Sequence, residues 1–332
     1  MGGTRYAGTV ASMRILVIGG SSFVGRHFVQ SALDRGHEVT LFNRGQTDPD
    51  AFPTAEHLTG DRNGDLSELA SRSWDSTVDV CAYVPAQVRR LLETLGDRAG
   101  HFTFISTISV YGKVDVESGF DETAPLLEPS YDDELTMEKY GELKVGCENV
   151  AQELAGDRLL VIRPGFVFGP HDPTHRFTYW VERVAEGGSP MAGPEAATPL
   201  QGVDGRDLGA FTASQVEKGT VDVFHVTAPE PAPTFAEWFS TIASALDVQL
   251  PEVKWVGAKD ELPLAVPEDW WPKMRAGLGK ARAAGFTWRP LEETIRDTYD
   301  WVTKARADGK YQPRPGVGLT PGQERELLAA EG

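Results

Sequence analysis

Residues 14–25 read RILVIGGSSFVG, an apolar run that passes directly into a glycine-rich turn. The run 14–18 is continuous rather than alternating, which is typical of a strand buried on both faces of a parallel sheet. Apolar residues at helical spacing follow from Phe23 and stop before Gly36, so the sequence predicts a helix over 23–35. A strand, a glycine turn and a helix in this order are the context that a dinucleotide-binding fingerprint requires.

The glycine-rich turn supplies the candidate contacts for a pyrophosphate; the alternative is a turn with a structural role alone. Glycines allow a tight turn and a close backbone approach, and the positive end of the following helix favours an anion. Ser22 stands where the usual pattern has its middle glycine, so the backbone there carries a Cβ and a hydroxyl that can donate to phosphate. The expected cofactor contacts in this turn are Gly19, Ser21, Ser22, Phe23, Val24 and Gly25.

Strand-like and helix-like segments continue to alternate as far as about residue 165. This alternation predicts an α/β fold, a Rossmann-type doubly wound parallel sheet with a smaller C-terminal substrate-binding lobe. The predicted strands after the first are 38–42, 78–82, 101–105, 159–162 and 221–226, and the further predicted helices are 65–71, 85–95 and 135–154.

Loss of the alternation, together with clusters of Gly and Pro, marks where the chain changes character. The predicted parts are a disordered lead-in at 1–12, a dinucleotide-binding Rossmann domain at 13–165 to which 200–228 returns, a substrate-binding lobe at 166–199 and 229–310, and a loosely held tail at 311–332.

The end of the second predicted strand bears on the choice of cofactor. Sites for NAD usually place an acidic residue there to bind the ribose 2′-hydroxyl, whereas an arginine accommodates the 2′-phosphate of NADP. This chain has Asn43 in the acidic position, followed by Arg44. The sequence therefore favours NADP over NAD, the alternative being that Arg44 faces solvent.

Tyr140 and Lys144 are four residues apart in a segment predicted to be helical. Positions i and i+4 share a helix face, so the phenol and the ammonium can enter one cleft. A neighbouring cation stabilises phenolate and is expected to lower the pKa of the tyrosine towards neutral pH, which would make it a usable general acid or base. The alternative is a packed tyrosine beside a solvated lysine.

Hydroxyl groups follow the strand 101–105 in the stretch from Ser106 to Gly112, at an edge where open α/β sheets bind ligands. With the glycine turn and the Tyr140–Lys144 pair, this stretch resembles the extended branch of the short-chain dehydrogenase/reductase superfamily, also called the NAD-dependent epimerase/dehydratase family. The resemblance runs from about Met13 to Trp301. It also rests on Gly60-Asp61, Arg163-Pro164, Gly169-Pro170, residues 203–208 and residues 291–298.

The resemblance implies roles for individual residues. Thr107 matches the residue that hydrogen-bonds the substrate oxygen, Tyr140 the proton donor or acceptor, and Lys144 the residue that binds the nicotinamide ribose and lowers the tyrosine pKa. Further cofactor contacts are expected at Asp61, Arg62, Cys81, Ala82, Tyr83 and Pro164. Substrate contacts are expected at Thr107, Ser109, Phe166, Val167 and Arg176.

One departure from the family bears on the substrate. Members that act on nucleotide sugars commonly carry an asparagine just after the Arg-Pro step, where this chain has Gly165. A metal could be held by His171 and Asp172 with His175 by spacing alone. We expect no metal, because the mechanism that the resemblance implies needs none.

Charge and composition limit the partners. A net charge of −17 disfavours nucleic acid and anionic membranes, which attract basic surfaces. The sequence contains no apolar run of the length that a membrane helix needs. Cys81 and Cys147 lie in apolar segments, as reduced thiols in a cytoplasmic protein would. The expected partner is a small-molecule substrate, and the resemblance adds a possible homodimer.

Three hypotheses of function follow. The leading one is an NAD(P)-dependent oxidoreductase that moves hydride between nicotinamide and a carbinol or carbonyl carbon, with a Thr/Tyr/Lys catalytic set. The first alternative is an NAD-dependent epimerase or dehydratase acting on a nucleotide sugar with the same residues. The second is a non-catalytic cofactor-binding or RNA-associated protein.

Overall fold

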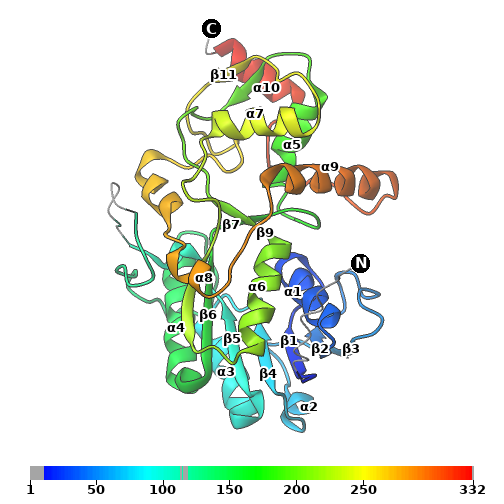
Figure 1. Ribbon diagram of the computed structural model, residues 1–332, viewed down its shortest axis with the longest axis vertical. Helices are drawn as coiled ribbons and strands as arrows, with labels where there is room; N and C mark the ends of the chain where they lie inside the picture. Colours follow the sequence, from blue (N-terminus) through cyan, green and yellow to red (C-terminus); the bar gives the residue numbers. More distant parts are fainter. Residues whose placement is uncertain (1–10, 113, 115–118, 331–332) are drawn as a thin grey trace, which may run out of the picture.

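The computed structural model describes residues 11–112, 114 and 119–330. Its centre is one seven-stranded parallel sheet in the order β10-β6-β5-β4-β1-β2-β3, so the predicted doubly wound α/β fold is confirmed (Figure 1). Strand order reverses between β1 and β4, and ligands bind at such a switch point. The strands are β1 Arg14–Ile18, β2 Glu38–Asn43, β3 Glu56–Thr59, β4 Ser76–Asp79, β5 His101–Ile105, β6 Leu159–Pro164 and β10 Asp222–Val226.

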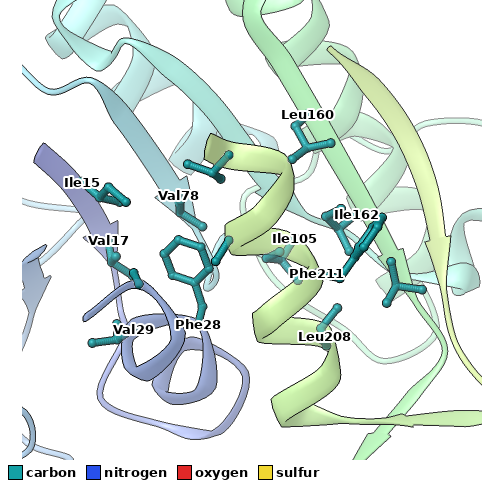
Figure 2. Packing of buried hydrophobic residues seen from close by; sticks show 14 of the residues in the cluster. Ile15, Val17, Phe28, Val29, Val78, Ile105, Leu160, Ile162, Leu208 and Phe211 are labelled. Atoms are coloured by element: carbon teal, nitrogen blue, oxygen red, sulfur yellow. The ribbon is translucent and has the colours of Figure 1, made fainter. Parts of the chain in front are cut away.

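Helices cover both faces of this sheet, which explains why β1 is apolar without interruption. One face carries α1 (Phe23–Asp34) and α6 (Gly205–Glu217), and Figure 2 shows Phe28 and Phe211 from these helices over the strands. The other face carries α3 (Pro85–Leu95) and α4 (Tyr140–Ala155). Ile15 and Val17 of β1 point into the first core, whereas Leu16 and Ile18 point into the second.

A separate lobe with its own hydrophobic core lies beyond the carboxyl ends of the strands (Figure 1). Its core is aromatic and includes Trp180 of α5 and Trp238 of α7, both almost fully buried. The elements of this lobe and of its junction with the sheet are β7 Phe166–Phe168, α5 Arg176–Glu186, β8 Met191–Gly193, β9 Gly202–Asp204, α7 Phe235–Ala245, β11 Val253–Trp255, a 3-10 helix Glu268–Arg275, α8 Gly279–Ala283, α9 Leu291–Ala307 and α10 Pro321–Ala330.

Several boundaries differ from the sequence prediction. The helix expected from residue 135 begins at Tyr140, and the residues before it are an exposed turn in which Lys139 pairs with Asp132 at 2.6 Å. The strand expected over 78–82 ends at Asp79, so Cys81 and Ala82 follow the strand in a loop. The sequence did not predict β3, because it is short and buries one residue, Leu58. The helix expected over 65–71 is shortened to Ser67–Ala70 (α2).

The prediction of a loosely held tail is wrong for most of residues 311–330. Helix α10 packs Leu327 and Leu328 against the aromatic core of the lobe. Its Glu324 is buried and accepts hydrogen bonds from Arg183 Nε at 2.9 Å and from the backbone N–H of Ala192 at 3.0 Å. Because these partners are far away in sequence, the local Pro and Gly content could not reveal them. Most of the predicted lead-in, residues 1–10, lies outside the described residues.

Glu324→Ala is expected to lower the free energy of unfolding by about 3 kcal/mol, because it leaves the buried Arg183 guanidinium without its carboxylate. Urea denaturation measures the change. Glu326→Ala is the matched control, since Glu326 lies on the same helix but is exposed. Equal stability of the two variants would contradict the view that Glu324 fastens α10 to the lobe.

Candidate active site

The glycine turn lies between β1 and α1 at the switch point of the sheet. Gly19 and Gly20 have φ values of 102° and 90°, a region that side chains disfavour. At Gly25 a Cβ would come within 2.8 Å of the Gly20 backbone, so the turn depends on glycine at both ends. Ser22 precedes the first residue of α1, and its side chain makes no capping hydrogen bond. The first turn of α1 also lacks an acidic residue, so its N–H groups can receive an anion.

A pocket of about 330 Å³ opens beside this turn at the carboxyl edge of the sheet. Eight of the predicted cofactor residues line it: Gly19, Ser21, Asn43, Arg44, Asp61, Arg62, Cys81 and Tyr83. Ser22 and Phe23 line a neighbouring hollow instead, and Val24 and Gly25 belong to the first turn of α1. Pro164 ends β6, and the carbonyl of Ala82 faces Lys144.

The side chains of Asn43 and Arg44 differ in whether they already have partners within the protein. The amide of Asn43 is engaged, donating to the carbonyl of Gly19 at 3.2 Å and accepting from the N–H of Gly45 at 2.8 Å. Arg44 is exposed at the pocket wall and has no ion-pair partner among the residues that the structure describes. Asn43 therefore shapes the turn, while the guanidinium of Arg44 is available to a ligand.

Arg62 lines the same pocket, but its guanidinium is already paired. It donates to both carboxylate oxygens of Asp79, at 2.8 and 2.7 Å, and to the Cys81 sulfur at 3.3 Å. Sequence reasoning missed Asp79, which is fully buried at the end of β4. The available signal was an acidic residue at the end of a strand, at the edge of the sheet where ligands bind. It also missed Gln87, which accepts from the N–H of Tyr83 at 2.9 Å and donates to Asn63 at 3.1 Å on the pocket rim.

Lys144 is buried on α4, one turn after Tyr140. Its ammonium donates to the carbonyl oxygens of Ala82 at 2.9 Å and Ile105 at 2.7 Å, and lies 4.2 Å from the centre of the Phe104 ring. Burial lowers the pKa of Lys144. The lysine thereby ties the ends of β4 and β5 to the helix, and the solvated lysine of the alternative interpretation is ruled out.

Tyr140 is the first residue of α4, and its environment differs from the prediction. Burial raises the pKa of Tyr140 to about 12, and the Tyr83 phenol acts in the same direction. A hydrogen bond with the Thr107 side chain and the charge of Arg176 act in the opposite direction but are outweighed. The expected lowering by Lys144 is therefore wrong for the protein alone, because that ammonium is turned towards two backbone carbonyls.

Thr107 starts the short 3-10 turn Ile108–Val110 at the end of β5. Its hydroxyl accepts from the N–H of Ser109 at 3.1 Å, donates to the Ser109 hydroxyl at 3.2 Å, and reaches the Tyr140 phenol. Thr107 and Ser109 thus lie together beside Tyr140. The structure gathers the Thr, the Tyr and the Lys of the predicted catalytic set at the ends of β4 and β5.

The wall across from Tyr140 comes from the lobe. Phe166 of β7 lies in this wall, and Arg176 begins α5 with its guanidinium 5.2 Å from the centre of the Phe166 ring. The expected substrate contact at Val167 is not supported, because this next residue of β7 packs against the core under α1 and α6. Arg176 donates through Nε to the Thr174 hydroxyl at 3.2 Å, and no described carboxylate lies within ion-pair distance of it. Its terminal nitrogens are thus available on the Tyr140 side of the wall.

The histidines considered for a metal are occupied or neutral. Burial lowers the pKa of His171 and of His175 to about 4, and His175 Nδ1 is hydrogen-bonded to the hydroxyl of Tyr311. Within the described ranges, no cluster of three His, Cys, Asp or Glu side chains could hold a metal ion. In that same part of the chain, no helix combines the length and the apolar character needed to cross a bilayer.

Comparisons with known proteins identify relatives of the chain. The chain is similar to the chloroplast stem-loop binding protein of 41 kDa b from Arabidopsis thaliana, at 24% identity over 68% of this chain and 61% of that protein. It is also similar to the 3 beta-hydroxysteroid dehydrogenase/Delta 5-->4-isomerase of Mycobacterium tuberculosis, at 31% identity over 52% of each chain. The alignments thus span about half to three fifths of these relatives.

Among solved structures, the UDP-glucuronic acid 4-epimerase of Bacillus cereus in complex with NAD superposes with a TM-score of 0.67 and 17% identity. The superposition covers 88% of this chain and 99% of that one, and it shows that the fold is shared. The sequence model of the NAD dependent epimerase/dehydratase family matches residues 15–83 and 70–208. The chain therefore belongs to the NAD-dependent epimerase/dehydratase family, in the extended branch of the short-chain dehydrogenases/reductases.

Proposed function

We propose that this protein is an NAD(P)-dependent oxidoreductase that transfers hydride between nicotinamide and a carbinol or carbonyl carbon of a small molecule. The observation that carries the proposal is the meeting of Thr107, Tyr140 and Lys144 at the switch point, beside an open helix terminus and a pocket. Bound nicotinamide would supply or accept the hydride. Tyr140 would move the proton, Thr107 would hold the substrate oxygen, and Lys144 would hold the nicotinamide ribose.

The neutral phenol of Tyr140 suits the role of proton donor when a carbonyl is reduced, and the phenolate would accept the proton in the reverse reaction. With a pKa near 12, the phenol is neutral at physiological pH and can donate its proton to the substrate oxygen. The terminal nitrogens of Arg176 and the apolar ring of Phe166 would contact the substrate. A small molecule with a polar part for Arg176 and an apolar part for Phe166 fits this wall.

The pocket fits a dinucleotide on structural grounds. The N–H groups of α1 and the bare backbone at Gly19 and Gly20 suit a pyrophosphate, and the Asp61 wall suits the adenosine end. We propose NADP as the cofactor, because Arg44 is exposed and unpaired beside Asn43. An arginine there can form a charge-assisted pair with a 2′-phosphate.

Arg44→Ala is expected to weaken NADPH binding on the order of tenfold while leaving NADH binding unchanged, since a hydrogen bond to a charged group contributes about 1.5–3 kcal/mol. Fluorescence titration with both nucleotides measures the difference. Arg14→Ala is the control, because Arg14 is exposed at the start of β1, at the amino ends of the strands and away from the pocket. Adding Asn43→Asp to Arg44→Ala should reverse the preference. Tighter binding of NADH than of NADPH by the unaltered protein would overturn the NADP proposal.

The experiment that tests the proposed function is to denature the purified protein and identify any nucleotide that it releases. An exchangeable NADP site supports the reductase. Tightly retained NAD would favour the alternative of an epimerase or dehydratase acting on a nucleotide sugar, because such enzymes oxidise and re-reduce one cofactor within a turnover.

Gly165 argues against that alternative. A Cβ at this position would lie 2.3 Å from the hydroxyl oxygen of Thr227 and 2.9 Å from its Cβ. The asparagine of the nucleotide-sugar enzymes therefore cannot be accommodated here without movement of Thr227. Glycine is required by the neighbouring side chain, and the site lacks one polar contact that those enzymes commonly have.

An RNA-associated role is the second candidate, since a stem-loop binding protein is among the relatives. We expect no measurable filter binding to mixed RNA at about 150 mM salt, because a net charge of −17 repels the phosphate backbone. Retention of RNA on the filter at that salt would place this role above the oxidoreductase. Cytoplasmic localisation and a homodimer stay predictions from the sequence.

A further inference from the structure

A chain of buried polar side chains begins directly beside Thr107. The hydroxyl of Ser106 donates to Glu148 Oε1 at 2.5 Å. The carboxylate of Glu148 also accepts from Arg163, from Nε at 3.0 Å and from Nη2 at 2.6 Å. All three residues are at most 7% exposed, so these bonds are shielded from water.

The network of hydrogen bonds continues from Arg163 to Tyr111 and His225, and the positions of the hydrogens determine which group donates in each bond. Arg163 Nη1 donates to the hydroxyl of Tyr111 at 2.6 Å, and this hydroxyl lies 2.5 Å from His225 Nε2. The carbonyl of Gly277 beside His225 Nδ1 can only accept, so Nδ1 of a neutral ring holds the proton and Tyr111 donates to Nε2. His225 then carries its proton on Nδ1 and donates to the carbonyl of Gly277 at 3.2 Å. Burial lowers the pKa of His225 to about 4, in agreement with the neutral ring that this pattern needs.

The two ends of this hydrogen-bonded network show which parts of the site it connects. Ser106 immediately precedes Thr107, and Glu148 follows Lys144 by one turn of α4. At the far end, Gly277 follows the 3-10 helix Glu268–Arg275, whose Met274 packs in one cluster with Ile108 and Val110 of the Thr107 loop. Phe166 of the proposed substrate wall packs against the same cluster.

A buried ion pair of this kind gives little net stability, because the desolvation of both charges offsets their attraction. Its value lies in geometry, since alternative arrangements of the side chains would leave buried polar groups unpaired. Tyr111 is fully buried, and its ring packs edge-on against His225 at 5.2 Å, which fixes the hydroxyl.

We infer that Ser106, Glu148, Arg163 and Tyr111 are positioning residues that hold the Thr107 loop against Tyr140. This inference rests on the function proposed above, because it assigns the network to the geometry of that reaction. Small displacements of a catalytic group cost much of its rate, so a network that fixes the loop acts on kcat rather than on cofactor affinity.

The first test measures the loop itself and needs no substrate. Ser106→Ala and Tyr111→Phe each remove one hydroxyl from the network, one at its near end and one further along. Thr103→Val is the control, since Thr103 is buried on the same strand β5 and its hydroxyl has no partner among the described residues. Hydrogen exchange of the amides of 105–112, referenced to those of β1, should be on the order of tenfold faster in both network variants than in the control. Equal exchange in all three variants would overturn the inference.

The second test is a double-mutant cycle on kcat. Ser106→Ala is expected to lower kcat on the order of tenfold in the unaltered protein and by less than about twofold when Thr107 is already Val. KM for the cofactor should stay within about twofold throughout. Losses that multiply would show that Ser106 does not act through Thr107, and positioning would be overturned. If Thr107→Val itself leaves kcat unchanged, the proposed catalytic set is wrong. Faster hydrogen exchange of the loop in the network variants would in that case still support the inference that the network holds the loop in place.

Discussion

Tyr140→Phe is expected to lower kcat by about 10²- to 10⁴-fold while the affinity for the cofactor stays within about twofold. The change removes one hydroxyl, and in the proposed reaction that hydroxyl is the group that gives its proton to the substrate oxygen. The ring keeps its contact with Tyr83, whose centre lies 6.5 Å away. Ground-state binding should therefore be almost unaffected, whereas the transition state loses its acid.

Steady-state kinetics and a fluorescence titration with cofactor separate these two effects. Tyr131→Phe is the control, because Tyr131 is 58% exposed and lies in the turn before α4. Retention of more than about a third of the unaltered kcat by the Tyr140 variant would remove Tyr140 from the mechanism, since transition-state contacts show their loss in kcat. A comparable loss in the Tyr131 variant would point to damage of the whole turn.

Lys144→Met should impair both cofactor binding and turnover. The buried ammonium is held by the carbonyl oxygens of Ala82 and Ile105, which leaves one hydrogen for the proposed bond to a nicotinamide ribose. Loss of a charged hydrogen bond predicts cofactor binding weaker by at least about tenfold. A second loss of about 10²-fold in kcat is expected because the charge beside the reacting groups disappears.

Methionine keeps the length of the side chain but leaves both carbonyls without a donor. The free energy of unfolding should fall by about 1–3 kcal/mol, so binding must be measured well below the melting temperature of the variant. Lys139→Ala is the control, since Lys139 is exposed and pairs with Asp132. Calorimetric titration that gives unaltered cofactor affinity for Lys144→Met would return this lysine to a purely structural role.

The sheet could be predicted from the sequence because burial on both faces makes central strands such as β1 and β6 almost continuously apolar. The apolar stretch 14–18 and the turn after it are enough to place β1 and the switch point. Helix ends were harder to predict, since residues 135–139 have acceptable helical propensity but lie in an exposed turn. Only distant partners determine such a boundary.

The candidate site shows the same division between local and distant causes. The spacing of Tyr140 and Lys144 correctly predicts a shared helix and a common face. It does not reveal that two carbonyls occupy the ammonium, or that desolvation of the phenol outweighs the nearby charges. Likewise, the sequence places Arg62 at the pocket but not its pairing with Asp79. The sequence could therefore name the charged residues of the site, but it could not show which groups they contact.

The crowding between Gly165 and Thr227 restricts how this protein could evolve towards another substrate. An asparagine at 165 collides with the Thr227 side chain, so that substitution alone would be selected against before it conferred any benefit. Alanine or serine at 227 would keep the Cβ that lies 2.9 Å from the added atom, so glycine at 227 has to come first, and by itself it brings no new contact. The route therefore requires two mutations in a fixed order, with a neutral or slightly deleterious intermediate. Such epistasis makes the change of specificity slow, even though only two positions of the chain have to change.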